Sequence, residues 1–181
     1  MALRHGLRKV VVTGVGFVSP LGCGSENVWE SLIRGESGII SIPPTSSSYT
    51  LSTAPQLERL DAIKVAALVN GFDSTALFGK GVDREKSRFI QYAMHASDLA
   101  LEHAGLNLNP KDITKTDSET ETETIPTIGG IYLKSRFGVA IASGIGAIHD
   151  IVEGQKAFEI AAGGRKLSPY FVPKVLANMA G

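Results

Sequence analysis

The side chains best able to do chemistry are one cysteine and four histidines. Cys23 precedes a predicted helix whose macrodipole could favour the thiolate, but no histidine lies near it in sequence to act as its base. A small residue in a glycine-rich loop is therefore the favoured interpretation of Cys23. The histidines lack metal-ligand spacing and are expected on the surface; they are His5, His95, His103 and His149. The sequence predicts no metal site and no cofactor.

The glycines Gly14 and Gly16 follow an apolar run and form most of a dinucleotide-binding fingerprint. That motif needs a helix that begins at once, so that its N-terminus can hold the pyrophosphate. Here Pro20 and further glycines come before Ser25, and the third glycine of the motif is absent. A tight turn from strand to loop is favoured over a nucleotide site.

Four basic residues gather near the start of a predicted long helix. Cations there oppose the helix dipole, which costs about 0.3–1 kcal/mol each when they are exposed. Asp83 and Glu85 offset part of this cost, so a solvated face and an anion-binding surface both remain open. The basic residues are Lys80, Arg84, Lys86 and Arg88.

The elements that would position these groups alternate between strands and helices. Residues 9–18 and 137–143 are apolar, β-branched runs of the kind expected for strands buried on both faces. Helices are predicted from Ser25 to a stop at Gly35, from a cap at Asp83 to Gly105, and over 147–162. This order of elements indicates an α/β fold.

The composition excludes several classes of protein. A length of 181 residues with 43% hydrophobic residues is typical of a globular domain with a core. The formal net charge is zero, so no overall basic field points to nucleic acid. No apolar run approaches the roughly 20 residues that span a bilayer. A single cysteine fits a reducing compartment.

Two segments depart from this globular pattern. Residues 114–127 alternate acidic and polar side chains without apolar periodicity, which predicts a flexible acidic insertion. The N-terminus is basic, and its first acidic residue is Glu26, as in mitochondrial presequences. Only about eight residues precede the first predicted strand, too few for a full presequence. A mitochondrial or cytoplasmic location is expected, with the mitochondrion favoured.

Three motifs carry a resemblance to a known family. Residues 11–22, 143–146 and 168–179 resemble the N-terminal part of β-ketoacyl-acyl-carrier-protein synthases, the condensing enzymes of type II fatty-acid synthesis. Residues 148–151 and 169–174 resemble mitochondrial-type members. The resemblance implies a partial thiolase-like fold, the N-terminal portion of the αβαβα layered architecture. Residues 1–181 would then be one incomplete condensing-enzyme domain carrying the 114–127 insertion.

The family resemblance also implies a reaction and its partners. Family members join an acyl group held on a cysteine to malonyl-carrier by a decarboxylating Claisen condensation, assisted by two histidines. Their cysteine follows the segment that resembles Asn178–Ala180 here, so the resemblance implies no catalytic residue in this chain and rejects Cys23. Ile145 and Phe171 resemble acyl-pocket positions, and Phe171 would reach the neighbouring subunit of a homodimer.

The resemblance gives the basic cluster a partner, the acidic acyl carrier protein. Family members dock this protein through basic residues ahead of a segment like 89–92 here. Arg84 keeps a basic residue of that cluster, one helical turn from Arg88, whereas Gly81 and Glu85 replace residues that are often basic. Two function classes follow: part of a condensing enzyme, inactive alone, or a non-catalytic carrier-binding or pseudo-subunit module.

Overall fold

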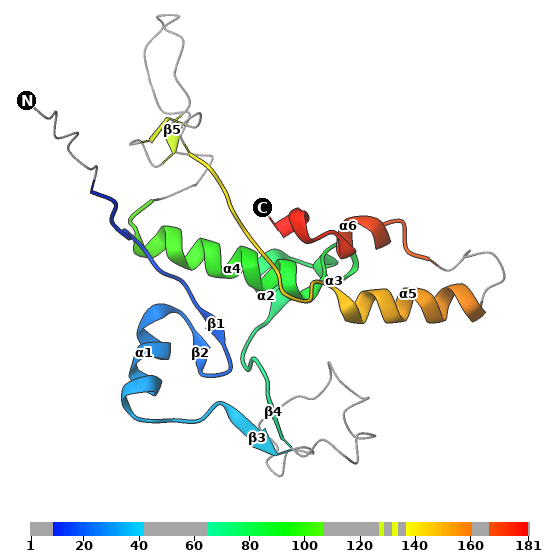
Figure 1. Ribbon diagram of the computed structural model, residues 1–181, viewed down its shortest axis with the longest axis horizontal. Coiled ribbons are helices and arrows are strands. Elements are labelled where there is room, and N and C mark those ends of the chain that lie inside the picture. The colour runs from blue at the N-terminus through cyan, green and yellow to red at the C-terminus, as the bar shows by residue number, and fades with distance from the viewer. Residues whose placement is uncertain are drawn as a thin grey trace, which may run out of the picture.

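The computed structural model describes residues 9–41, 65–106, 127–128, 132–133, 137–160 and 167–180. Helices dominate these residues, and the long helix α4 lies at their centre (Figure 1). The helices are α1 (Ser25–Ile33), α2 (Ser74–Phe78), α3 (Val82–Glu85), α4 (Arg88–His103), α5 (Ile148–Ile160), α6 (Phe171–Val175) and the 3₁₀ helix η5 (Ala177–Ala180). The strands are β1 (Val18–Ser19), β2 (Gly22–Cys23), β3 (Ile39–Ser41), β4 (Val65–Ala67), β5 (Thr127–Ile128) and β6 (Tyr132–Leu133).

The described strands form three separate antiparallel pairs: β1 with β2, β3 with β4, and β5 with β6. Val18 lies opposite Cys23 in the first pair, and Ile39 lies opposite Ala67 in the second. These short ladders do not join into a larger sheet within the described residues. The layered αβαβα arrangement expected from the resemblance is therefore not visible in this part of the chain.

The two predicted buried strands are wrong in the structure. Of residues 9–18 only Val18 lies in a strand, and residues 137–143 form none. Val10 is 94% exposed and Val139 is 64% exposed. A strand exists through hydrogen bonds to its neighbours, and apart from Val18, which pairs with Cys23, neither run has a neighbouring strand among the described residues. Both runs are apolar, as the sequence indicates. The sequence pattern does not show whether other strands are present to bury them.

The N-terminal segment instead packs against α4, as the blue trace in Figure 1 shows. A Cβ added at Gly14 would lie 2.1 Å from the carbonyl oxygen of Ala100, and one added at Gly16 would lie 2.1 Å from that of Ala96. Only glycine permits this approach of backbone to backbone. The spacing that resembled a nucleotide fingerprint is thus explained by close packing on a helix.

The predicted stops of α1 and α4 are confirmed. Gly35 and Gly105 have φ angles of 69° and 70°, the left-handed conformation that ends a helix. Each glycine amide donates to the carbonyl three residues back, at 3.0 and 2.9 Å. The amides of Glu36 and Leu106 donate to the carbonyls five residues back, at 3.0 and 2.8 Å. Both helices therefore end in a complete Schellman motif.

The predicted helix from Asp83 to Gly105 is broken into two. The short helix α3 ends at Glu85, Lys86 is extended with φ −124° and ψ 132°, and Ser87 is the N-cap of α4. Asp83 does not cap a helix, because its carboxylate accepts hydrogen bonds from other helices instead. The break changes the direction of the chain within the basic cluster.

The buried apolar core of the described residues is small. It consists of Val28, Val82, Ile90, Ala147 and Ala180. Many larger apolar side chains remain exposed, including Trp29 at 62% and Phe158 at 56%. Most of residues 114–127 lie outside the described part, so the predicted flexible insertion stays a prediction. No helix in the described part of the chain is long and apolar enough to span a membrane.

Candidate functional site

A buried glutamine holds the basic cluster together. Gln91 is only 1% exposed, although it is a polar residue on the amphipathic helix α4. Its Nε2 donates to Oδ1 of Asp83 and to the carbonyl oxygen of Lys86, both at 2.9 Å. Its Oε1 accepts from Nη1 of Arg88 at 3.1 Å. One amide group thereby fixes the end of α3 against the start of α4.

Asp83 is the acceptor at the centre of this network. Ser74 of α2 donates to the same Oδ1 atom at 3.0 Å, so the carboxylate joins three helices. Partial burial acts to raise the pKa of Asp83, but the hydrogen bonds from Gln91 and Ser74 outweigh it. The positive charges of Arg88 and Lys174 add to the same effect. The net result is a pKa of Asp83 below its ordinary value, which keeps the carboxylate charged.

The two arginines of the cluster point to different neighbours. A continuous helix would have placed Arg84 and Arg88 one turn apart on the same face. Because α3 and α4 are separate, the guanidinium of Arg84 instead lies 6.0 Å from the ring centre of Tyr170. The guanidinium of Arg88 lies 5.6 Å from the ring centre of Phe72. Both distances fall within the range of cation–π contact.

The two lysines of the cluster are less constrained. Lys80 is exposed and makes no hydrogen bond or ion pair with any described residue. Lys86 lies 4.0 Å from Glu85, and the two side chains are 37% and 49% exposed. An exposed pair at this distance contributes little. These lysine charges are therefore accessible to an external anionic group.

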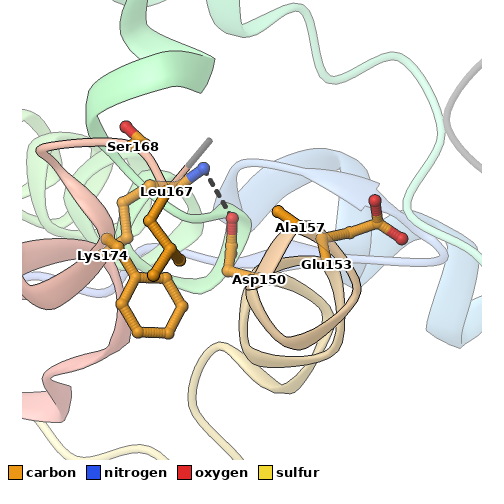
Figure 2. A pocket seen from close by; sticks show the side chains of 8 residues that line it. Asp150, Glu153, Ala157, Leu167, Ser168 and Lys174 are labelled. Carbon is orange, nitrogen blue, oxygen red and sulfur yellow. Dashed lines mark ion pairs between the residues drawn. The ribbon is translucent and has the colours of Figure 1, made fainter. Parts of the chain in front are cut away.

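A second feature lies where α5 and α6 pack together (Figure 2). A cavity of about 260 Å³ opens between them. Lys174 of α6 forms an ion pair with Asp150 of α5 at 2.5 Å. The Phe171 ring lies on α5 at Gly154. The remaining lining residues are Glu153, Ala157, Leu167 and Ser168.

The two predicted acyl-pocket residues are not brought together in this cavity. Phe171 lines it, whereas Ile145 does not and is 76% exposed. Ile145 sits in a turn that is closed by the amide of Gly146, which donates to Oγ of Ser143 at 2.8 Å. Gly146 has a φ of 68°, the left-handed conformation that favours glycine in this turn before α5.

Cys23 has the environment of a structural residue. Partial burial raises the pKa of its thiol, which is the opposite of what a nucleophile needs. The helix dipole considered from the sequence does not produce a lowered value here. His103, expected to be merely solvated, accepts a hydrogen bond at Nδ1 from the amide of Val15 at 3.1 Å. No three His, Cys, Asp or Glu side chains in the described residues gather to hold a metal.

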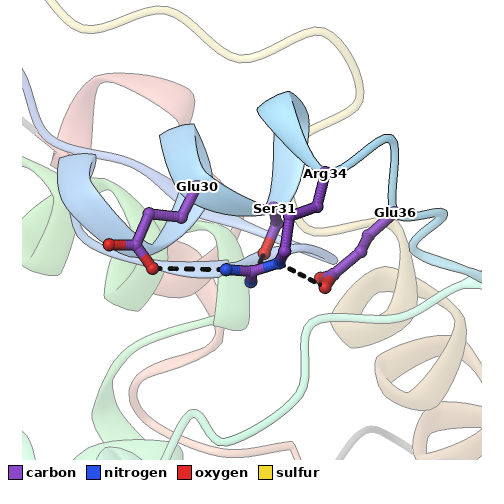
Figure 3. Close-up of polar contacts among 4 residues, drawn as sticks. All are labelled: Glu30, Ser31, Arg34 and Glu36. Carbon is purple, nitrogen blue, oxygen red and sulfur yellow. Dashed lines mark hydrogen bonds and ion pairs between the residues drawn. The ribbon is translucent and has the colours of Figure 1, made fainter.

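An exposed ion cluster fixes the end of α1 (Figure 3). Arg34 Nε donates to Glu36 at 2.7 Å, and Arg34 Nη1 donates to Glu30 at 3.3 Å. The hydrogen bond from Arg34, together with one from Ser31, lowers the pKa of Glu36. These groups are solvated, and we assign them no role beyond ordering the Schellman turn.

Sequence reasoning missed two residues that organise this region, Gln91 and Lys174. A buried Gln91 breaks the usual expectation for a polar residue on an amphipathic helix. The hydrogen bonds of Gln91 depend on the helix break at Lys86 and Ser87, which the sequence pattern does not show. Lys174 donates to the carbonyl oxygen of Asp83 at 3.1 Å, across 91 residues of sequence. No local pattern could have shown that contact.

Comparison with known proteins gives one consistent family. The sequence model described as "Beta-ketoacyl synthase, N-terminal domain" matches residues 7–181. The chain is 36% identical over 172 residues to "3-oxoacyl-[acyl-carrier-protein] synthase 2" of Vibrio cholerae, covering 95% of this chain and 34% of that protein. It is 36% identical over 186 residues to "3-oxoacyl-[acyl-carrier-protein] synthase, mitochondrial" of Arabidopsis thaliana, covering 97% and 35%. A Saccharomyces cerevisiae synthase homolog is 34% identical, with 96% and 37% covered.

Solved structures support the same fold. A beta-ketoacyl synthase from Burkholderia phymatum matches with a TM-score of 0.62 and 20% identity, covering 96% of this chain and 35% of that one. The ishigamide ketosynthase/chain length factor matches with a TM-score of 0.59, also at 20% identity, covering 96% and 35%. The predicted thiolase-like class is confirmed for the N-terminal portion of the fold. The chain spans about a third of the length of the relatives it matches.

Proposed function

Because this chain belongs to the β-ketoacyl synthase family, matched through its N-terminal domain, we propose that it forms the N-terminal part of a 3-oxoacyl-[acyl-carrier-protein] synthase of fatty-acid elongation. The observation that carries this proposal is the match over residues 7–181, together with 36% identity to synthases of that description. The substrates of the whole enzyme would be acyl and malonyl groups carried on the phosphopantetheine of an acyl carrier protein.

The reaction of the whole enzyme would be a decarboxylating Claisen condensation. The acyl group passes from its carrier to a cysteine thiol, and malonyl-carrier loses carbon dioxide to give a carbanion. That carbanion attacks the thioester and releases the thiol, leaving the 3-oxoacyl product on the carrier. Within the whole enzyme, residues 1–181 would supply part of the docking surface and part of the acyl pocket.

The docking role is supported by the accessibility of the basic cluster. Lys80 and Arg84 are exposed, and Lys86 is half-buried beside a weakly paired Glu85. An acidic carrier protein would be attracted to these charges, mainly through a faster association rate that falls with added salt. Asp83 and Glu85 reduce this field, but residues 80–88 still carry four basic side chains against two acidic ones.

The contacts of Phe171 support an acyl-pocket role, whereas the exposure of Ile145 does not. The ring of Phe171 lies against Gly154 of α5 and lines the cavity between α5 and α6. Ile145 is exposed, so it would line a pocket only when covered by a further part of the enzyme or by a second subunit. We therefore propose that both residues act in a homodimer, where Phe171 contributes to the neighbouring pocket.

We propose that residues 1–181 do not catalyse condensation by themselves. The sequence holds one cysteine, and burial raises the pKa of its thiol. Covalent catalysis requires an activated nucleophile, and Cys23 is not one. The test is elongation of acyl- and malonyl-carrier by the purified chain. No product above background is expected, and product formation that disappears in Cys23→Ser would overturn the proposal.

A non-catalytic carrier-binding or pseudo-subunit module remains the second candidate. It is favoured by the same inactive environment of Cys23 combined with an accessible basic cluster. The coding sequence after codon 181 separates the two candidates. An in-frame continuation that supplies a cysteine and two histidines supports the condensing enzyme, and a stop codon in the mature transcript supports the module.

Carrier docking can be tested directly by isothermal titration of the chain with an acidic acyl carrier protein at low salt. Combined Lys80→Glu and Arg84→Glu substitution should weaken binding at least tenfold. The control is Lys156→Glu on α5, which reverses one exposed charge away from the cluster. A loss of binding free energy in the control half as large as in the double variant would show that only total charge matters.

We propose a mitochondrial or cytoplasmic location, as for the bacterial and mitochondrial relatives. The basic N-terminal residues support import, but residues 1–8 lie outside the described part of the structure. Fusion of residues 1–30 to a fluorescent protein tests this point. Mitochondrial accumulation that is abolished by Arg4→Glu and Arg8→Glu is expected, and diffuse fluorescence of the unaltered fusion would favour the cytoplasm.

A further inference from the structure

The helix that carries Phe171 is tied to the basic cluster by two contacts. Nζ of Lys174 donates to the carbonyl oxygen of Asp83 in α3 at 3.1 Å. The guanidinium of Arg84, the next residue of α3, lies over the ring of Tyr170, which is the N-cap of α6. These contacts come from the two ends of α6 and both reach α3.

Lys174 also ties α6 to α5. Its ion pair with Asp150 is shielded, since the two side chains are only 16% and 18% exposed. Shielding from water strengthens an ion pair relative to the open surface pairs of this chain. Figure 2 shows the ammonium of Lys174 directed at Asp150 beside the cavity. One side chain thus bridges α3, α5 and α6.

Phe171 has little freedom within this arrangement. It lies between Tyr170 and Lys174 on one short helix, and its ring rests on Gly154. A Cβ added at Gly154 would lie 2.3 Å from Cε2 of the ring and 3.0 Å from Cδ2 and Cζ. A small shift of α6 must therefore change the position of the ring over Gly154, because the contact has no slack.

We infer that Lys174 and Tyr170 are positioning residues that couple the basic segment α3 to Phe171. An anionic carrier domain that binds at Arg84 competes for the guanidinium with the Tyr170 ring. The resulting shift of α6 moves Phe171 over α5. This inference rests on the proposed function, since it assigns carrier docking to α3 and acyl contact to Phe171. It adds a link between the two sites that neither role alone requires.

The backbone amide of Gly154 offers a reporter, because the aromatic ring that lies against this residue shifts its resonance. The experiment is NMR titration of the ¹⁵N-labelled 181-residue chain with an acidic acyl carrier protein that bears unacylated phosphopantetheine. In the unaltered chain the Gly154 resonance should move on saturation. In Lys174→Met and in Tyr170→Leu the movement at saturation should fall at least threefold. Tyr170→Phe keeps an aromatic ring and should preserve the movement.

Lys156→Met is the matched control, since it removes an exposed ion pair of α5 and should leave the Gly154 response intact. Helical circular dichroism equal to that of the unaltered chain excludes unfolding of a variant. If the carrier binds and the Gly154 resonance stays fixed, the coupling is wrong while the docking role stands.

A second experiment needs no carrier protein. It therefore tests the coupling between α3 and Phe171 even if the carrier does not bind. Arg84→Gln should by itself move the Gly154 resonance, and the same substitution on a Tyr170→Leu background should move it at least threefold less. Equal movements on the two backgrounds would overturn the coupling. If the carrier protein does not bind in the NMR titration, the proposed docking role is wrong. The Arg84→Gln comparison then decides by itself whether α3 and α6 are coupled.

Discussion

The ring of Phe171 and Gly154 are in direct contact, and the space between them is too small for a methyl group. A Cβ at Gly154 would come within 2.3 Å of the ring carbon Cε2. Gly154 lies inside the helix α5, where glycine is normally unfavourable by about 1 kcal/mol relative to alanine. The helix therefore tolerates a poor helix former because it admits the aromatic ring.

Gly154→Ala should destabilise the chain by up to about 2 kcal/mol, because overpacking costs about 1–3 kcal/mol and the gain in helix propensity offsets about 1 kcal/mol of it. On a Phe171→Ala background the same substitution should instead stabilise by about 1 kcal/mol. Urea denaturation of the four chains measures both effects. The same sign on both backgrounds would show that the ring does not set the cost.

Alanine at Gly14 or Gly16 should destabilise the chain by at least about 2 kcal/mol. The added Cβ would meet a helix carbonyl oxygen at 2.1 Å, and a backbone atom cannot move aside like a side chain. Gly138→Ala is the matched control, since nothing lies within 4 Å of its added Cβ. Thermal denaturation should separate the two clearly, and similar melting temperatures would refute the close packing on α4.

Gln91→Leu should cost about 1–3 kcal/mol, because it leaves the polar partners of a buried amide without their hydrogen bonds. Gln155→Leu provides the comparison: Gln155 is exposed and bonds only to Glu159 at 3.0 Å among the described residues. Its loss should change stability by no more than about 0.5 kcal/mol. Denaturant midpoints of both variants measure the two losses of stability. Equal losses would show that Gln91 only fills space and that its hydrogen bonds do not stabilise the fold.

The lowered pKa of Asp83 predicts a specific acid sensitivity. Its folded pKa lies below the unfolded value of about 3.9, so the charged carboxylate stabilises the fold above that pH. This contribution is lost as the pH falls from about 3.9 through the folded pKa. The stability difference between the unaltered chain and Asp83→Asn should be largest near neutral pH and shrink on acidification.

Ser74→Ala should reduce this pH dependence, because it removes one of the hydrogen bonds that lower the pKa of Asp83. Free energies of unfolding between pH 2.5 and 7 measure both effects. A stability difference that stayed constant over this range would contradict the assignment of the carboxylate as the charged acceptor.

Cys23 should react slowly with iodoacetamide, since burial raises the pKa of its thiol and the thiolate is the reacting form. At pH 7.5 its rate should be at least several-fold below that of free cysteine, and the difference should vanish in denaturant. Faster alkylation than free cysteine would reopen the possibility of a nucleophilic role.

The sequence was sufficient where structure is determined locally. The stops at Gly35 and Gly105 were predicted because a left-handed residue after a helix has a clear chemical signature. The family resemblance identified the fold class, which the solved structures support.

The sequence was insufficient where distant residues meet. The predicted long helix failed at Lys86 because Asp83 bonds to Ser74 and Gln91, a choice decided by tertiary contacts. The predicted buried strands failed because periodicity reports apolar character and not the presence of a neighbour. Likewise, Lys174 had no local signature, since its partner lies 91 residues away.

The contact between the N-terminal segment and α4 has a consequence for the order of events during synthesis. Val15 and His103 are hydrogen-bonded across 88 residues of sequence, so the first segment leaves the ribosome well before its helix exists. At about 5–20 residues per second this interval is roughly 4–18 s. During that time the close fit of Gly14 and Gly16 on α4 cannot form. A slowed ribosome lengthens this interval, so translation rate over residues 20–105 should influence the yield of folded protein.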